Sequence, residues 1–280
     1  MISISKQTPL ILEGGGDRGV FTTGVLDCFL EHQIMFPYVV GVSAGGFNAV
    51  SYLSKQRGRQ KKISLDLAFQ YKTSSLRKWV LTGNLLDDKI LFEDFTERII
   101  PFDYQTFFDN PALCEFVTTN CLTGEALYLH EKKNKKRLID IIKASGRLPF
   151  ASPMVMLDGI PMLDGGMADS IPLERAMRLG YTDHPVVVLT RNKGYRKPAS
   201  SYKMAKLFYP KYPKLTEALA NRYKMYNRQL EVVEQLESEH KICVLRPQKE
   251  IQVKRVNNTS ANLATLYEEG YELAAAFLKE

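Results

Sequence analysis

The chain has 280 residues, of which 45% are hydrophobic and 25% charged, and its formal net charge is +7. This composition excludes a mainly disordered chain and provides enough apolar material for a large core, and no run approaches the ~18 consecutive apolar residues of a membrane-spanning helix. Because no signal-peptide pattern follows Met1, we expect a cytoplasmic protein.

The first third of the chain predicts alternating strands and helices. Residues 8–12 and 37–42 are short apolar runs typical of buried strands, and apolar residues recur at helical spacing in 19–32 and 44–57. Strands that alternate with helices indicate a parallel sheet covered by helices. We therefore predict an α/β fold with three layers, α/β/α, around a mostly parallel central sheet.

The later elements are predicted from shorter patterns. Helices are expected at 63–78, 91–99, 137–145, 172–179, 215–239 and 261–278, and strands at 113–118, 126–130, 161–163, 185–190 and 242–245. Three prolines, Pro198, Pro210 and Pro213, leave segment 191–214 without a predicted element.

The sequence Gly41-Val42-Ser43-Ala44-Gly45 is a G-x-S-x-G motif. It follows a predicted buried strand and begins a helix, the context in which a serine on a sharp turn is presented as a nucleophile. The N-terminus of that helix offers free N–H groups and a positive dipole end to an oxyanion. Taken alone, the motif fits equally well a glycine-rich turn in which Ser43 is the helix N-cap.

The first predicted strand is followed by Gly14-Gly15-Gly16-Asp17-Arg18-Gly19, which satisfies the G-x-G-x-x-G pattern of dinucleotide-binding loops. A dinucleotide site also needs an acidic residue near the end of the second strand, and residues 33–42 contain none. The alternative is an oxyanion hole, in which the backbone N–H groups of successive glycines face a developing negative charge. Both loops follow parallel strands, at the sheet edge where ligands bind in open α/β sheets.

A serine nucleophile needs a base, and the four histidines are poorly placed for that role. His184 and His240 precede predicted strands, which puts them at the opposite edge of the sheet. His32 lies at the end of a helix that leads away from the motifs, and His130 lies beside a run of charged residues. A Ser-His-Asp triad is therefore disfavoured.

Asp164-Gly165-Gly166 follows an apolar run, and Asp164 is another candidate base. The alternative is that Asp164 and Gly165 only form an Asp-Gly turn, which is common. Metal-ligand spacing is not found, because the four cysteines contain no C-x-x-C pair and Asp158, Asp164 and Asp169 do not match a calcium-binding loop. We expect no metal and no cofactor.

Together these motifs resemble the patatin-like phospholipase family. That family has a G-G-G-x-[K/R]-G loop near its N-terminus, then a G-x-S-x-G elbow and later D-G-[G/A], and the three occur here in that order. Ala144-Ser145 with Pro149 is similar to the family's A-S-x-x-x-P stretch, and the resemblance covers residues 8–190. We expect a patatin-like catalytic domain at 1–190 and a mainly helical C-terminal extension at 191–280 packed on the same domain.

The resemblance implies a serine lipid acyl hydrolase that works without histidine. Ser43 would be the nucleophile and Asp164 its only side-chain base, hydrogen-bonded directly to it. The backbone of the first loop would form the oxyanion hole, with Arg18 holding the loop in shape rather than touching the substrate. The loop comprises Gly14, Gly15, Gly16, Asp17, Arg18 and Gly19.

We expect this enzyme to cleave carboxyl esters of phospholipids or lysophospholipids through an acyl-enzyme. Two alternatives stay open: an esterase or thioesterase acting on small acyl substrates, and a nucleic-acid-binding protein with a vestigial site.

The second alternative rests on segment 191–214, which runs from Arg191 to Lys214. It has eight basic residues, no acidic ones and five interleaved aromatic residues, but no recognition motif, so nucleic acid is not expected as a partner. The same segment indicates transient docking on an anionic membrane surface, to which lysine and arginine are attracted, or a solvated loop that only aids solubility.

Overall fold

The computed structural model describes residues 4–199, 202–250, 252–256 and 258–279. Its strands are β1 (Pro9–Leu12), β2 (Tyr38–Val42), β3 (Leu113–Asn120), β4 (Ala126–Leu129), β5 (Val155–Leu157), β6 (Ile160–Asp164), β7 (Val186–Val188) and β8 (Cys243–Leu245). They form one sheet in the order β5-β6-β3-β2-β1-β7-β8, with β4 beside β3. Strands β3, β2, β1, β7 and β8 run parallel, and β4, β5 and β6 add antiparallel pairs at one side.

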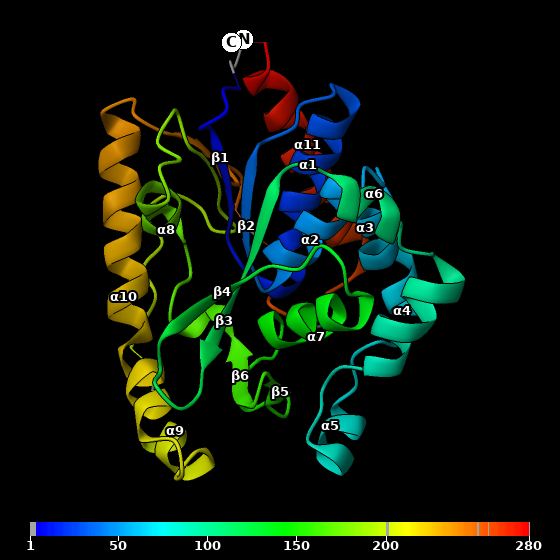
Figure 1. Ribbon diagram of the computed structural model, residues 1–280, viewed down its shortest axis with the longest axis vertical. Coiled ribbons are helices and arrows are strands. Elements are labelled where there is room, and N and C mark those ends of the chain that lie inside the picture. Colours follow the sequence, from blue (N-terminus) through cyan, green and yellow to red (C-terminus); the bar gives the residue numbers. More distant parts are fainter. Residues whose placement is uncertain (1–3, 200–201, 251, 257, 280) are drawn as a thin grey trace.

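Helices cover both faces of this sheet (Figure 1). They are α1 (Val20–Glu31), α2 (Ala44–Leu53), α3 (Arg59–Lys62), α4 (Ala68–Gln70), α5 (Leu76–Thr82), α6 (Tyr104–Asp109), α7 (Lys135–Ser145), α8 (Leu173–Arg178), α9 (Tyr202–Phe208), α10 (Pro213–Ser238) and α11 (Ser260–Phe277). Segments Ile63–Leu67 and Ile90–Ile99 are π-helical, and Gly16–Gly19 and Gly165–Met167 are single 3₁₀ turns. None of the helices in the described part of the chain has both the length and the hydropathy to span a membrane.

The central strands are buried on both sides, which explains their continuous apolar runs. In β1, Leu10 and Leu12 pack into the core shared with α1, α2, α7 and α11, whereas Ile11 packs into the opposite core with α8 and α10. Adjacent residues of a strand point to opposite faces, so this short strand serves both layers. The predicted three-layer α/β/α class is confirmed.

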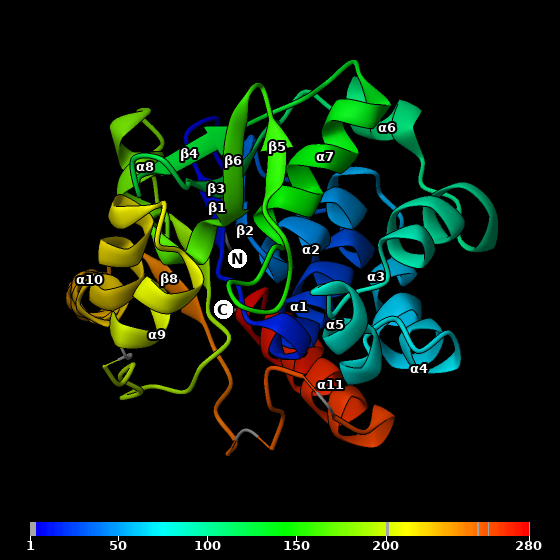
Figure 2. The same ribbon diagram turned by 90° about the horizontal axis from the view of Figure 1, so that it is seen from below.

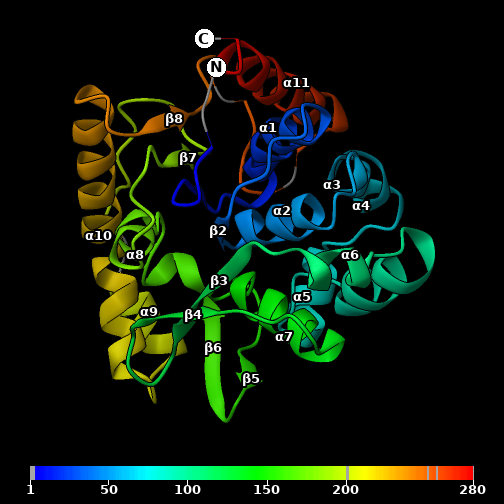
Figure 3. The same ribbon diagram turned by 45° about the horizontal axis from the view of Figure 1, so that its top comes forward.

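The last 90 residues lie on both sides of the sheet (Figure 3). Helix α10 covers one face, β8 extends the sheet beside β7, and α11 packs against α1 on the other face. The division of the chain at residue 190 stays a prediction, since the C-terminal segment adds a strand to the same sheet.

Several local predictions need correction. The helix expected at 63–78 is interrupted after α4, where Lys72 has a positive φ of 50°, and α5 starts afresh with Ser75 accepting a hydrogen bond from the Lys78 amide. The helix expected at 44–57 ends at Leu53. Helices α6 and α9 and strand β5 were not anticipated, because elements of three to seven residues carry little periodicity.

Candidate active site

Ser43 lies on a sharp turn between β2 and α2. Its backbone has φ 54° and ψ −120°, an unusual conformation for a residue with a side chain. The turn is tight because Gly41 and Gly45 touch: a Cβ on Gly41 would lie 2.7 Å from the carbonyl carbon of Gly45. Ser43 is the N-cap of α2 by position, but its side chain makes no capping hydrogen bond, so the hydroxyl is not used to cap the helix.

A second serine holds this turn from the side. The Ser43 amide donates a hydrogen bond of 3.0 Å to the hydroxyl of Ser145, which is fully buried at the end of α7. This bond fixes the backbone at Ser43 from an element 102 residues away along the chain. The role of Ser145 was not anticipated from the sequence, although the family's A-S-x-x-x-P stretch was a signal that could have indicated it.

The glycine loop lies directly beside the Ser43 turn. A Cβ on Gly14 would approach the Cβ of Ser43 to 2.9 Å, and Gly16 has a positive φ of 59° that favours glycine. The amides of Gly15 and Gly16 have no hydrogen-bond partner among the described residues and are free for a ligand. By contrast, the Asp17 amide, which was also predicted for the oxyanion hole, already donates to the carbonyl of Arg255 at 3.0 Å.

Asp164 ends β6 and is buried, with 2% of its surface exposed. Its Oδ1 accepts a hydrogen bond from the Gly166 amide at 2.8 Å, and its own amide donates to the carbonyl of Arg147 at 2.8 Å. Its Oδ2 has no donor among the described residues, so one carboxylate oxygen orients the side chain and the other stays available.

The predicted direct hydrogen bond between Ser43 and Asp164 is absent from this structure, although both side chains line one polar pocket. Catalytic hydrogen bonds often lengthen when no substrate is bound and tighten in the substrate complex. The structure therefore brings the two residues together without closing the bond between them.

Two cavities meet at Ser43. The first, of about 230 Å³, is mainly apolar. Its wall includes Val20, Phe47, Leu91, Phe92, Phe95, Ile139, Ile142 and Leu263. The second is a small polar pocket that also contains Asp164 and the glycine loop. Ser43, Gly16, Leu148 and Arg255 line both, so Ser43 lies where an apolar and a polar space join.

Arg18 departs from its expected role. Its side chain is 5% exposed, and its Nε has no hydrogen-bond partner among the described residues, so it does not hold the glycine loop in shape through such bonds. It lines the polar pocket instead. Burial, with the nearby charges of Arg191 and Arg255, lowers the pKa of Arg18 to about 10.

None of the four histidines lines either cavity at Ser43. His184 and His240 lie together in a separate hollow with Pro185 and Ile242, at the amino-terminal ends of β7 and β8, as their sequence positions predicted. His32 is exposed and contacts the Cys28 carbonyl through Nδ1, and His130 is exposed after β4.

The fold and the site together define a class: three-layer α/β proteins with a serine elbow after the second strand, a glycine loop after the first and a buried aspartate. The family model described as patatin-like phospholipase matches residues 10–177, and the chain belongs to that family. The resemblance seen in the sequence is thereby confirmed. A second family model, described as a domain of unknown function, matches residues 212–280.

Individual relatives agree with this assignment. The chain is 32% identical over 194 residues to the uncharacterized protein YjjU of Escherichia coli, and 26% identical over 176 residues to the lysophospholipase NTE1 of Scheffersomyces stipitis. These matches cover 68% and 61% of this chain, but 54% and 11% of the relatives, so the chain spans only part of their length. In fold it is similar to VipD from Legionella pneumophila, with a TM-score of 0.51 and 13% identity over 98% of this chain and 67% of that one.

Proposed function

We propose that the protein is a serine lipid acyl hydrolase that cleaves carboxyl esters of phospholipids or lysophospholipids. Ser43 is the nucleophile and Asp164 the base of a Ser-Asp dyad. The observation that carries the proposal is the apolar cavity of about 230 Å³ that opens onto Ser43, because a lipid acyl chain needs such a space and a small acyl group does not.

In this mechanism Ser43 Oγ attacks the ester carbonyl while its proton passes to Asp164 Oδ2. The carbonyl oxygen becomes an oxyanion that is held by the free amides of Gly15 and Gly16 and by the N-terminus of α2. Collapse of the tetrahedral intermediate breaks the ester C–O bond, and Asp164 returns the proton to the leaving alcohol. Asp164 then takes a proton from water, which attacks the acyl-serine. When the second tetrahedral intermediate collapses, the bond between the acyl carbon and Ser43 Oγ breaks, Asp164 returns the proton to Ser43 Oγ, and the fatty acid is released.

Labelling and hydrolysis test this assignment together. A fluorophosphonate probe is expected to modify Ser43, and Ser43→Ala should abolish both labelling and fatty acid release, because no other serine in the described part of the chain has the positive φ of the elbow. Release of long-chain fatty acid from a lysophospholipid supports the lipid assignment. Turnover of short-chain esters or thioesters alone would favour the small-acyl alternative, and turnover by folded Ser43→Ala protein would contradict the mechanism.

We also propose that one end of the molecule docks on an anionic lipid surface. Helices α5 and α9 lie at this end, on either side of β5 and β6 (Figures 1 and 2). Both expose large apolar side chains: Leu76, Val80 and Leu81 on α5, and Met204, Leu207 and Phe208 on α9, with Val80 and Leu207 exposed by 75% and 76%. Exposed Arg77, Lys206 and Lys211 lie between or beside them, which suits an anionic surface.

Phe150 joins the two helices into one face. Its carbonyl accepts a hydrogen bond from Trp79 Nε1 of α5 at 2.9 Å, and its amide donates to the Tyr209 hydroxyl just after α9 at 2.8 Å. Its ring also packs edge-on against Phe208, with 5.2 Å between the ring centres. Leu148, two residues before Phe150, lines both cavities, so the loop that joins the two helices also reaches the site of Ser43.

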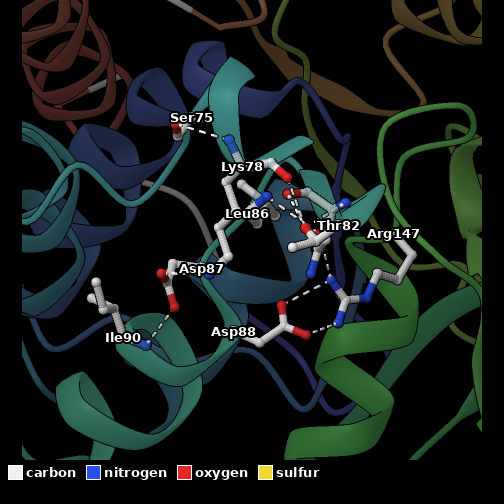
Figure 4. A network of polar contacts seen from close by, with 9 residues as sticks. Ser75, Lys78, Thr82, Leu86, Asp87, Asp88, Ile90 and Arg147 are labelled. Atoms are coloured by element: carbon white, nitrogen blue, oxygen red, sulfur yellow. Dashed lines mark hydrogen bonds and ion pairs between the residues drawn. The ribbon is translucent and has the colours of Figure 1, made fainter. Parts of the chain in front are cut away.

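A polar network fixes α5 in this position (Figure 4). Lys78 pairs with Asp87 at 2.5 Å, and Arg147 pairs with Asp88 through both guanidinium nitrogens. Arg147 is buried beside Asp164, so the segment carrying α5 is tied to the loop that supports the candidate base. The apolar face is therefore held rigidly next to the site.

The docking face overlaps the basic segment 191–214 only in part: α9, Lys206 and Lys211 belong to that segment, whereas other basic residues of it face elsewhere. Arg196 pairs with Glu234 at 2.6 Å, Lys214 with Glu217 at 3.4 Å, and Arg191 and Lys197 turn into the polar pocket. The side chain of Lys203 lies outside the described residues.

Vesicle binding tests the docking face. Leu81→Asp with Leu207→Asp should weaken binding to vesicles rich in phosphatidylserine by about tenfold or more, because two exposed apolar side chains are lost and two negative charges added. Met177→Asp places the same charge on an exposed methionine of α8, away from this face, and should bind as the unaltered protein does. Equal binding by all three proteins would exclude the docking face.

A further inference from the structure

The polar pocket beside Ser43 is crowded with basic side chains. Five line it, namely Arg18, Arg191, Lys197, Arg222 and Arg255. Only two acidic residues share the pocket, Glu13 and Asp164. Like charges gathered in a buried place repel one another and lose hydration, so such a cluster costs stability unless a ligand supplies the opposite charge.

The acidic residues do not neutralise this cluster by direct contact. Glu13 is buried and its carboxylate is already occupied, because it accepts hydrogen bonds from the Thr190 amide at 2.6 Å and from the Tyr226 hydroxyl at 2.7 Å. The free oxygen of Asp164 is the one assigned to catalysis. No carboxylate of the described residues forms an ion pair with any of the five basic side chains.

The contacts that these side chains do make leave their charges unpaired. Arg222 Nε donates to the carbonyl of Gly166 at 2.5 Å. Arg191 and Lys197 lie over the rings of Tyr195 and Tyr226, each at 4.3 Å from the ring centre. Arg18 is 95% buried, since 5% of its surface is exposed, and its Nε has no hydrogen-bond acceptor among the described residues. A buried guanidinium without an acceptor, in a pocket of like charges, indicates an anion that is bound in function.

The electrostatics of the pocket agree with a site for an anion. Burial, reinforced by Arg222 and Arg255, lowers the pKa of Lys197 to about 7, and burial also lowers the pKa of Arg222. A bound anion would reverse both effects, because an opposite charge nearby favours the protonated form.

We propose that this pocket is a phosphate subsite that selects lipid esters carrying a phosphate on the same glycerol as the scissile ester. The inference rests on the proposed function, because it places the phosphate of a substrate relative to Ser43. Ser43 lies where the two cavities join, so an acyl chain in the apolar cavity leaves the glycerol at Ser43 and its phosphate in the polar pocket. Guanidinium groups suit such a ligand because they bind phosphate oxygens in pairs.

The pocket is narrow in this structure, with a free volume of about 20 Å³, enough for about one water-sized group. A phosphate therefore enters as the long side chains of Arg191, Lys197 and Arg255 move apart. Because four of the five basic residues come from beyond residue 190, the C-terminal segment would set the preference for phosphate.

The first experiment compares two substrates with the same acyl chain, 1-oleoyl-glycerol 3-phosphate and 1-oleoyl-glycerol, in one nonionic detergent. Lys197→Met and Arg255→Met are each expected to lower the ratio of kcat/KM for the phosphate ester over the neutral ester by roughly 10- to 100-fold, the range for losing one charged hydrogen bond. Lys193→Met removes an exposed charge from the same segment outside the pocket and should keep the ratio.

The second experiment separates the lipid phosphate from free phosphate. Inorganic phosphate is titrated into the protein by calorimetry, and the same is done with 1-oleoyl-glycerol 3-phosphate and Ser43→Ala protein, which should not turn it over. The proposal expects Lys197→Met and Arg255→Met each to weaken binding of the lipid. If the variants weaken binding of inorganic phosphate while the substrate ratio stays constant, the site serves free phosphate and the proposal is overturned. Unchanged binding and an unchanged ratio would show that no anion binds there.

The outcomes of the binding experiment are independent of the proposed activity. If the unaltered protein hydrolyses neither ester, the hydrolase assignment fails, yet lipid titration still reports on the pocket. Weaker lipid binding by Lys197→Met than by Lys193→Met would then uphold a phosphate site without hydrolysis, and equal binding would overturn it. Thermal unfolding of each variant identifies any that fails to fold, and Lys197→Gln then replaces Lys197→Met.

Discussion

The two cavities that meet at Ser43 come from different parts of the chain. The apolar cavity is formed almost entirely by residues before 150, with Arg255, Val256 and Leu263 as the exceptions. The polar pocket takes four of its five basic side chains from beyond residue 190. In the proposed function, the patatin-like part therefore supplies the reaction and the acyl site, while the C-terminal part supplies recognition of the rest of the substrate.

The largest effect should come from the candidate base, Asp164, which lines the polar pocket but belongs to the patatin-like part. Asp164→Asn keeps an oxygen for the Gly166 amide and so preserves the turn, but it removes the base, and we expect kcat to fall by about 10³- to 10⁴-fold on phosphorylated and neutral esters alike. Steady-state kinetics with both substrates checks this.

The histidines provide the controls for that measurement. His184 and His240 lie in a separate hollow, so His184→Gln and His240→Gln should each keep most of the activity. A loss of activity of about 10³-fold in either variant would contradict the Ser-Asp dyad and favour a Ser-His-Asp triad.

Filling the apolar cavity should affect acyl selection and leave phosphate selection alone. Ala68 lines this cavity, and Ala68→Phe is expected to lower kcat/KM for oleoyl esters by roughly 10- to 100-fold relative to butyryl esters, since each displaced methylene contributes ~0.8 kcal/mol of binding. Ala261→Phe adds the same ring at an exposed position and serves as the control. If Ala68→Phe also changed the ratio of kcat/KM for the phosphate ester over the neutral ester, the two cavities would not select acyl chain and phosphate independently.

A smaller, pH-dependent effect is expected on the affinity of the polar pocket for an anion. The pKa of Lys197 is lowered to about 7 by burial and by Arg222, Arg255 and Arg191, with Glu13 acting in the opposite direction. Because a bound anion favours protonated Lys197, affinity should fall as pH rises through about 7. Sulfate keeps its charge over this range, and its affinity by calorimetry should drop several-fold between about pH 6 and pH 8. Lys197→Met should give a flat profile, and a flat profile in the unaltered protein would contradict this account.

The smallest effect is expected at the hydrogen bond that positions the elbow. Ser145→Ala leaves the buried Ser43 amide without an acceptor, which should lower stability by about 1–3 kcal/mol and kcat by a few-fold. Ser54→Ala removes another buried hydroxyl, whose hydrogen bond of 3.1 Å goes to the Ser51 carbonyl at the end of α2, and should affect stability alone. Equal kcat in the two variants would limit Ser145 to a structural role.

The patatin-like part was largely predictable because its signals are local. Gly41, Ser43 and Gly45 are neighbours in sequence, and their turn chemistry can be recognised next to a buried strand. The same holds for Asp164, which is the last residue of the buried strand β6. Short segments such as α6 and β5 escaped prediction because three to six residues carry too little periodicity.

The polar pocket was not predictable for the opposite reason. Arg222 lies within a long amphipathic helix and Arg255 in a loop, and neither position differs locally from an exposed basic residue. Only the packing of α10 and of the segment after β8 brings them to Gly166 and Gly16. The positive charge of segment 191–214 was recognised, but its inward-facing members, Arg191 and Lys197, could not be told from the outward-facing ones.

The contacts between the glycine loop and the C-terminal segment have a consequence for synthesis. Asp17 accepts a hydrogen bond from Asn258, 241 positions further along the chain, and its amide donates to Arg255. Translation releases the N-terminal end first, so the three motifs leave the ribosome while these partners are still missing. A nascent chain that stops before residue 255 has a serine elbow but an unfinished loop beside it. The onset of hydrolysis should therefore follow the synthesis of the segment that contains Arg255 and Asn258 rather than that of the three motifs.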